Sequence, residues 1–394
     1  MRLACRRRAR SLRLRCSRRA RKTMVKGTPM QTSTSTEDHR PHVALALQGG
    51  GAIGAFQAGV LEALDTAGVH IDACCGASIG AINAALFFGN EPACRIERLR
   101  AFWDAISVPD GLSHAVSAGW LLPFIDDSTM RRALAEAEQG YAMMAGLPGF
   151  FSRRLVVPVL RGNGNPANAS VFDMQPLLRT LAALCDFDRL NATTTRVSVV
   201  ATHVASGDAH FFDNRDTRLD VTRIAASSAL PPWFAPVKID DEWYWDGSLS
   251  AGLPLKRIVE TAPADRPTVV LRADLWSGEG AVPDNMTDVE IRQKNILQAS
   301  RAALFEQGWR DVSELQATLA HALERIDARA IADDPRLAHA ASRLPRHALR
   351  IVPVDYRRTQ CETHFKDGQF GKAAIAEHWE NGRRAAEAVL AEVG

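Results

Sequence analysis

Apolar residues near the start of the chain follow first a strand pattern and then a helical one. Residues 43–47 (VALAL) form a short apolar run that stops at glycines, as a buried parallel strand does. Over residues 56–64 apolar side chains recur at the spacing of one helical face, and Gly68 is placed to end that helix. Residues 69–75 predict a second strand and residues 79–88 a second helix. This unit favours a parallel sheet covered by helices, with a site at the carboxyl ends of the strands.

The second half of the chain has fewer distinct elements. Residues 268–271 predict a further strand. Apolar side chains recur at helical spacing over residues 312–326, which predicts an amphipathic helix packed on the core, with packing on a partner as the alternative. Three other apolar features are expected to pack in the core, the alternative being reception of an acyl chain or contact with a membrane: residues 119–125, residues 141–151, and Trp233 with Phe234.

Composition indicates a large globular protein of one domain with an appended region, or of two domains. The chain has 394 residues, of which 46% are hydrophobic and 24% charged. No apolar run approaches the roughly 18 residues of a membrane-spanning helix. Seven cysteines, an odd number, are spread from Cys5 to Cys361 and do not resemble a disulfide framework. We therefore expect a cytoplasmic protein, with transient contact to a membrane surface as a further expectation.

The charge of the chain is unevenly distributed. Residues 1–26 contain twelve lysines and arginines and no acidic residue, so the net charge of +3 divides into +12 for this arm and −9 for the rest. We interpret residues 1–41 as a disordered basic arm and linker, or as a start assigned ahead of Met24 or Met30. The alternatives are an Arg-rich targeting peptide and an arm that binds nucleic acid or anionic lipid. The folded domain itself is not expected to bind nucleic acid.

A serine framed by glycines is the main candidate for chemistry. Ser78 lies in GASIG, after an apolar strand and before a helix, which is the pattern of a nucleophile elbow. Gly76 and Gly80 leave room for the sharp turn that such an elbow needs. The helix that follows directs its N-terminal dipole at the site, where negative charge would develop.

The glycine-rich segment GGGAIG precedes this elbow. Gly49, Gly50 and Gly51 allow the backbone to approach an acyl group and supply N–H donors for an oxyanion. With Gly54 the segment also fits the loose GxGxxG pattern of a dinucleotide site, which needs an acidic residue about 20 positions on. Asp72 lies near that distance but inside an apolar segment. The pair of motifs therefore favours serine-based acyl transfer, and its short spacing differs from that of an ordinary α/β-hydrolase.

The serine needs a base, and Asp246 is the best candidate. It ends the aromatic-rich run EWYWD, and Gly247 after it allows an unusual backbone angle. An ordinary Asp-Gly turn is one alternative. A triad that uses a late histidine such as His364 is the other, because histidine is the usual general base.

In this order, GGGAIG, GASIG and DGS resemble the three signature motifs of the patatin-like phospholipases. The intervening residues 171–191 and 226–247 also resemble that family, and the resemblance covers roughly residues 43–255. The tail at residues 364–382 is similar to that of a bacterial subgroup of these proteins.

The resemblance implies a three-layer α/β/α fold with a mainly parallel central sheet and a helical C-terminal extension. It divides the chain into a catalytic domain at residues 42–259 and an extension at residues 260–394 that packs on it. It also implies that Ser78 is the nucleophile and Asp246 the base of a dyad, and that the glycines at 49–51 form the oxyanion hole. Neither a metal nor an organic cofactor is expected.

The resemblance further implies a phospholipase A-like reaction, in which the acyl ester bond of a lipid is cleaved through an acyl-serine intermediate. Two alternatives stay open. One is a carboxylesterase, thioesterase or polyester hydrolase with the same dyad. The other is a non-catalytic lipid-binding protein that keeps the fold.

Three positions depart from the family pattern. Ile53 stands where a basic residue is usual in the glycine loop, Ser248 replaces the small residue that commonly follows Asp-Gly, and Ser228 replaces a frequent glycine. None of these changes removes a reacting group, but the loss of a cation near the site bears on head-group preference.

Overall fold

The computed structural model describes most of the chain from residue 40 onward. The described residues are 40–108, 127–154, 164–252, 254–344, 347, 349–356 and 366–393. The basic arm at residues 1–26, the apolar stretch at residues 119–125 and His364 lie outside them.

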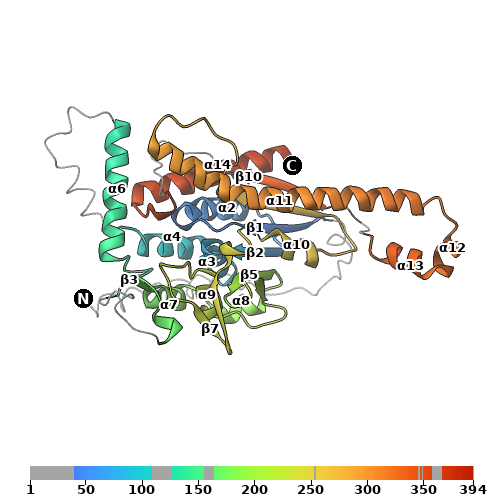
Figure 1. Cartoon of the computed structure of the whole chain (residues 1–394), viewed down its shortest axis with the longest axis horizontal. Coiled ribbons are helices and arrows are strands. Elements are labelled where there is room, and N and C mark those ends of the chain that lie inside the picture. The colour runs from blue at the N-terminus through green and yellow to red at the C-terminus, as the bar shows by residue number, and fades with distance from the viewer. Residues whose placement is uncertain are drawn as a thin grey trace, which may run out of the picture.

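An eight-stranded sheet forms the centre of the molecule (Figure 1). Its order is β10-β9-β1-β2-β5-β8-β7, and β6 also pairs with β5. Strands β10, β9, β1, β2 and β5 are parallel, whereas β6, β7 and β8 join antiparallel. This confirms the predicted α/β fold with a mainly parallel sheet. The bounds are β1 His42–Leu47, β2 Ala73–Ala77, β5 Arg196–His203, β6 Ala209–Asp213, β7 Val237–Ile239, β8 Glu242–Asp246, β9 Thr268–Asp274 and β10 Leu349–Asp355.

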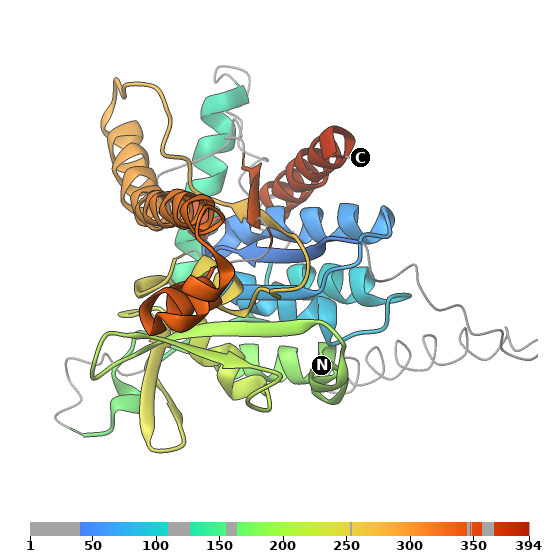
Figure 2. The same cartoon turned by 90° about the vertical axis from the view of Figure 1, so that its right-hand side faces the viewer.

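Helices cover both faces of this sheet (Figures 1 and 2). Alternate residues of a strand point to opposite faces, and in β1 Leu45 and Leu47 belong to one core cluster whereas Ala44 and Ala46 belong to another. The leucine side packs against α2 (Ala55–Thr66), α3 (Ile79–Phe88), α4 (Arg95–Ala105), α7 (Gln175–Leu184), α8 (Phe187–Ala192), α9 (Val221–Ser227) and α14 (Lys372–Val393). The alanine side packs against α10 (Leu255–Thr261) and part of α11 (Met286–Leu323).

The remaining described elements are short or peripheral. They are η3 (Gly51–Gly54), α6 (Asp127–Ala145), β3 (Ser152–Arg153), η6 (Pro166–Asn168), β4 (Phe172–Asp173), η7 (Gly247–Leu249), α12 (Ala328–Asp333), α13 (Pro335–Ser342) and η8 (Lys366–Gly368). Strands β3 and β4 form a separate two-stranded sheet.

The first strand–helix–strand–helix unit follows the sequence prediction closely, with one shifted boundary. Strand β2 begins at Ala73 rather than at residue 69. The N–H of Val69 donates to the carbonyl of Leu64 and so closes the end of α2. Just before the strand, the Asp72 carboxylate accepts hydrogen bonds from Arg40 and from the N–H of Val43.

The sheet continues into the C-terminal part of the chain. Strand β9, predicted at residues 268–271, pairs with β1 on one side and with β10 on the other. Helix α14 packs tightly on α2, because Gly59 and Gly382 let the two backbones approach. A Cβ at either glycine would come within 1.9 Å of a carbonyl oxygen of the opposite helix.

The predicted helix at residues 312–326 is real but is the end of a much longer one. Helix α11 begins after the N-cap Asn285, whose side chain accepts the N–H of Asp288. It crosses the alanine side of the sheet and projects beyond it (Figure 1). The prediction that its apolar face packs on the core is wrong for Val312, Leu315 and Leu319, which are exposed, whereas Leu323 is buried. Of the described helices, none combines the length and apolar composition that a membrane crossing needs.

The other apolar features split between core and surface. Phe150, Phe151 and Phe234 are buried, as predicted, and their rings pack with that of Phe172 in tilted and edge-to-face contacts. Met144 and Trp233, in contrast, are exposed.

Candidate active site

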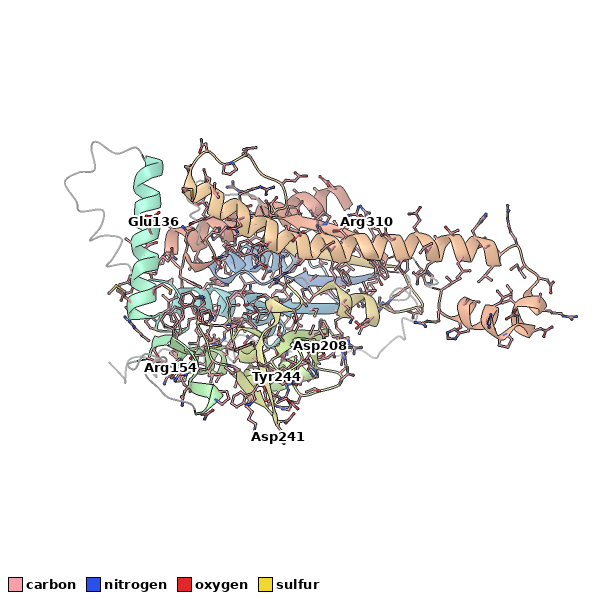
Figure 3. The ribbon with its side chains drawn as sticks, viewed as in Figure 1. Glu136, Arg154, Asp208, Asp241, Tyr244 and Arg310 are labelled. Carbon is pink, nitrogen blue, oxygen red and sulfur yellow. The ribbon has the colours of Figure 1, made fainter. Side chains whose placement is uncertain are left out.

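Strand register brings the two candidate reacting residues together. Ala77 at the end of β2 pairs with Val200 of β5, and Asp246 at the end of β8 pairs with the next residue, Ala201. Ser78 and Asp246 therefore leave the sheet at adjacent levels on either side of β5. Strand β8 can be found in Figure 3 from the label of Tyr244, two residues before Asp246.

Ser78 occupies a strained turn between β2 and α3. Its φ of 55° and ψ of −124° place a non-glycine residue in a region that side chains rarely adopt. Two neighbouring serines hold this turn from α9 and its C-cap. The N–H of Ser78 donates to Ser227 Oγ at 3.1 Å, and Ser228 Oγ donates to the carbonyl of Ser78 at 3.2 Å. The sharp strand-to-helix turn predicted around Ser78 is therefore present, and these two hydrogen bonds hold its backbone.

The Ser78 hydroxyl donates a hydrogen bond to Asp246 Oδ2 at 2.6 Å. The other carboxylate oxygen, Oδ1, accepts from the N–H of Ser248 at 2.8 Å and from Ser248 Oγ at 2.7 Å. Burial raises the pKa of Asp246 to about 6, and these hydrogen bonds from Ser78 and Ser248 oppose part of that rise. A carboxylate with such a pKa is ionised at neutral pH and remains basic enough to accept a proton.

The glycine loop lies directly beside this pair. A Cβ added to Gly49 would lie 2.9 Å from the Cβ of Ser248 and 3.2 Å from that of Ser78. Gly51 adopts a φ of +55°, and a Cβ there would lie 2.2 Å from the carbonyl of Asp367. Only glycine fits this position, so the loop conformation depends on the sequence GGG.

The three loop amides are not equivalent. The N–H of Gly49 donates to the carbonyl of Gly252 at 3.3 Å, so it is already engaged. The N–H groups of Gly50 and Gly51 donate to no other described residue. Of the three predicted donors, only those of Gly50 and Gly51 are not engaged by another described residue, and the hydrogen bond of Gly49 anchors the loop.

Close approach explains the other motif glycines. A Cβ at Gly54, Gly76, Gly80 or Gly247 would come within 2.1–2.5 Å of a neighbouring segment. For Gly247 the neighbour is the carbonyl of Val200. The expectation of an unusual backbone angle at Gly247 is wrong, because its φ lies outside the left-handed region.

Several residues that support the site carry no signal in the local sequence. Trp276, just after β9, donates its Nε1–H to the carbonyl of Gly49 at 2.9 Å. Gln48 accepts the N–H of Leu275 through its side chain, and its carbonyl accepts from Gln57. These contacts join the glycine loop to α2 and to the end of β9. The supporting roles of Trp276 and Gln48 become visible only from the residues that fold next to them.

The three departures from the family pattern also have defined places. Ser248 binds the Asp246 carboxylate and Ser228 binds the Ser78 carbonyl, so both support the site. Ile53 is completely buried below the loop, where its side chain would meet a Cβ at Gly50. It therefore packs in the core and does not face the reacting groups.

The alternatives to a serine–aspartate site find little support among the described residues. No described histidine forms a hydrogen bond with Ser78 or Asp246, and His364 is outside the described part. Asp72 precedes β2 and lies at the opposite end of that strand from Ser78, so it does not complete a dinucleotide site. In the same part of the chain, no group of His, Cys, Asp and Glu side chains is arranged to hold a metal ion.

Comparison with known families agrees with this geometry. A family described as patatin-like phospholipase matches residues 45–258, and one described as patatin phospholipase matches residues 296–393. The chain belongs to the patatin-like phospholipase family. The protein is therefore a hydrolase that acts on ester bonds. None of the curated proteins compared with the chain matches it.

Several solved structures are similar to parts of the chain. VipD from Legionella pneumophila is 14% identical with a TM-score of 0.38, over 94% of this chain and 72% of that one. ExoU from Pseudomonas aeruginosa, solved in complex with SpcU, is 20% identical with a TM-score of 0.27. That match covers 65% of this chain and about half (48%) of ExoU.

Proposed function

We propose that this patatin-like protein cleaves the acyl ester bond of a lipid through an acyl-serine intermediate, with Ser78 as nucleophile and Asp246 as general base. The observation that carries the proposal is the 2.6 Å hydrogen bond from the Ser78 hydroxyl to the buried Asp246 carboxylate. The adjacent glycine loop has two amides, those of Gly50 and Gly51, that donate to no other described residue. A lipid is the substrate class that the family match supports.

In the first half of the reaction, Asp246 accepts the proton of Ser78 as the serine oxygen attacks the ester carbonyl carbon. The carbonyl oxygen gains negative charge, and the N–H groups of Gly50 and Gly51 donate to it. The bond between that carbon and the alkoxy oxygen then breaks. The leaving alcohol takes the proton from Asp246, and the acyl group remains on Ser78.

In the second half, water attacks the acyl-serine and gives its proton to Asp246. The same two amides stabilise the second oxyanion. Cleavage of the serine ester then releases the fatty acid, and the serine oxygen recovers its proton. Asp246 is not consumed in either half, because it accepts and returns one proton in each.

A fluorophosphonate probe and a panel of phospholipid and p-nitrophenyl esters test the proposal. The wild type should be labelled and should turn over esters, whereas Ser78→Ala should lose the label and roughly 10⁴-fold or more of the activity. Ser206→Ala is a matched control, since Ser206 is an exposed turn residue bonded to His203. Labelling of Ser78→Ala at the wild-type level, or none of the wild type, would contradict the proposed nucleophile. Turnover of p-nitrophenyl esters without any lipid hydrolysis would reject the substrate class and retain the dyad.

A further inference from the structure

Helix α11 has two different apolar faces. One faces the body: Ile291 is buried, and Ala302 and Phe305 pack against the core cluster on the alanine side of the sheet. On the same side Glu306 binds Arg272 of β9. Figure 3 labels Arg310, which lies on the following turn and pairs with Glu306.

The second face carries an exposed apolar stripe. At 100° per residue, Leu297, Leu304 and Leu315 lie within about 20° of one line, roughly opposite the buried face. They are 57%, 74% and 69% exposed, respectively. Leu319 and Val312 border the same line and are also exposed. Large exposed apolar side chains that recur along one side of a helix indicate an interaction surface.

The stripe has the spacing of a coiled-coil seam. Its positions alternate by four and three residues from Leu297 through 301, 304, 308 and 311 to Leu315. Two charged residues, Arg301 and Asp311, interrupt it, and Gly308 leaves a gap between them. A lone charge at a seam position is costly unless the partner supplies the opposite charge.

The charges and the gap are self-complementary. A second α11 can be placed antiparallel to the first so that position 306 of one copy lies opposite position 306 of the other. Arg301 of each copy then faces Asp311 of the other copy. In the same register Leu297 faces Leu315, and Leu304 faces the gap at Gly308. Every polar interruption of the stripe then meets its counterpart.

We propose that the exposed stripe of α11 binds a second copy of this chain as an antiparallel helix pair with two-fold symmetry. A two-fold interface requires a patch that complements itself, and this stripe does so in charge, in shape and in apolar pairing. The overlap runs over most of the helix, roughly 50 Å at 1.5 Å per residue.

At Arg301 the dimer seam passes beside the candidate active site. Arg301 Nη1 lies 3.3 Å from the carbonyls of Ser248 and Leu249, the two residues that follow the Asp246-Gly247 turn. A guanidinium has five N–H donors, so Arg301 retains donors for a carboxylate of the second copy. Association would therefore hold the partner helix next to the segment that positions the base. The proposal does not depend on the catalytic roles of Ser78 and Asp246.

Charge exchange across the seam tests the proposal. Sedimentation velocity of the full chain should show a dimer for the wild type at roughly 1–100 µM. Arg301→Asp places two aspartates opposite each other, and Asp311→Arg places two arginines, so each variant should dimerise at least roughly 100-fold more weakly. An equimolar mixture of the two should associate again, because both pairs become complementary only in the heterodimer. The double variant should also dimerise.

The control is Ala317→Arg, which adds a charge to the opposite, exposed side of the same helix and should leave the dimer intact. The mixture also controls for folding, because misfolded variants would not recover association. A wild type that stays monomeric over this range would overturn the proposal. If in that case the wild type binds phospholipid vesicles and Leu304→Lys does not, the stripe contacts a membrane instead of a second copy. A dimer insensitive to both charge reversals would overturn the register and the surface.

Discussion

Two aspartates flank opposite ends of β5, and their surroundings differ in one respect that decides their behaviour. Asp213 on β6 is fully buried beside the start of β5. It accepts hydrogen bonds from Arg196 at 2.6 Å and Ser198 at 2.8 Å, and lies 3.2 Å from Arg257. Burial alone would raise the pKa of Asp213, but the hydrogen bonds, first that of Arg196, hold it below its usual value.

Asp246, at the other end of β5, is just as buried but has only uncharged donors. Burial raises its pKa to about 6, because the hydrogen bonds from Ser78 and Ser248 offset only part of the desolvation. A fixed cation makes a buried carboxylate a permanent anion. Hydroxyl and amide donors orient it and leave it able to take up a proton. The first arrangement suits an anchor of the fold, and the second suits a general base.

The largest expected effect follows from Asp246→Asn. Removing the base should lower kcat/KM for ester hydrolysis roughly 10²–10⁴-fold. Stability should move the opposite way. The raised pKa means that ionisation of Asp246 disfavours the folded state as pH rises from about 4 to about 6, so above this window the variant should be more stable than the wild type, by up to about 3 kcal/mol.

Urea unfolding of both proteins between pH 4 and pH 8, beside the ester assay, measures both halves of that prediction. Hydrolysis within tenfold of the wild-type rate would mean that another group takes the Ser78 proton. A stability difference that does not change with pH would mean that Asp246 does not titrate in this window.

A change in stability of opposite sign, without loss of the reacting groups, is expected for Asp213→Asn. The variant leaves Arg196 and Arg257 facing a neutral group and should lose about 2–4 kcal/mol of unfolding free energy at neutral pH. This loss is set towards the low end of what breaking a buried ion pair costs, because the side chains of Arg196 and Arg257 are 28% and 21% exposed to solvent. Because the pKa of Asp213 is lowered in the folded state, its carboxylate stabilises the fold at pH values above the usual pKa of an aspartate. The difference in unfolding free energy between the wild type and Asp213→Asn should therefore shrink as the pH falls through the pKa of the folded state.

The matched control for this variant is Asp216→Asn, in the same ion-pair network. Asp216 is 59% exposed, and its loss should change the unfolding free energy by no more than about 0.5 kcal/mol. Folded Asp213→Asn should still react with a fluorophosphonate. Equal destabilisation by both variants would argue that burial of the anion has no part in the effect.

The smallest effect is a change in pH dependence from Ser248→Ala. The wild-type kcat/KM should rise with pH through about 6 as Asp246 loses its proton. Ser248→Ala removes the Oγ donor at 2.7 Å and keeps the backbone donor at 2.8 Å. Weaker stabilisation of the carboxylate raises its pKa, so the acid limb should move upward by roughly 0.5–1 pH unit.

Ser250→Ala is the control for this shift, because the Ser250 hydroxyl bonds to Thr202 rather than to Asp246. Ser248→Thr, which keeps a hydroxyl, should restore the wild-type limb. A uniform loss of activity in Ser248→Ala, without movement of the limb, would assign the residue a packing role only.

Much of the region around the candidate active site was predictable because its signals are local. A buried strand is a short apolar run and its helix has a regular period, so β1, α2 and α3 follow from residues close together in the chain. The glycines that frame Ser78 mark a turn in the same way. Asp246, 168 positions from Ser78, was a candidate because it ends an aromatic-rich strand before a glycine, and the resemblance to the family motifs assigned it the role of base.

Other features depended on contacts between distant segments. The pairing of β8 with β5 sets the level of Asp246, and no local pattern specifies that register. Trp276 and Gly252 anchor the glycine loop, which leaves two amides open instead of three. The start of β2 lies at Ala73 because the chain first closes the end of α2, where the N–H of Val69 donates to the carbonyl of Leu64.

The sequence alone thus determined which segments become strands, helices and sharp turns, since these depend on neighbours along the chain. It also determined that α11 has an apolar stripe. Only the tertiary structure decided that this stripe faces away from the core, because the opposite side of the helix already fills the place on the sheet. It likewise decided which carboxylate is poised for a proton, since that depends on whether folding brings an arginine or a serine to its side.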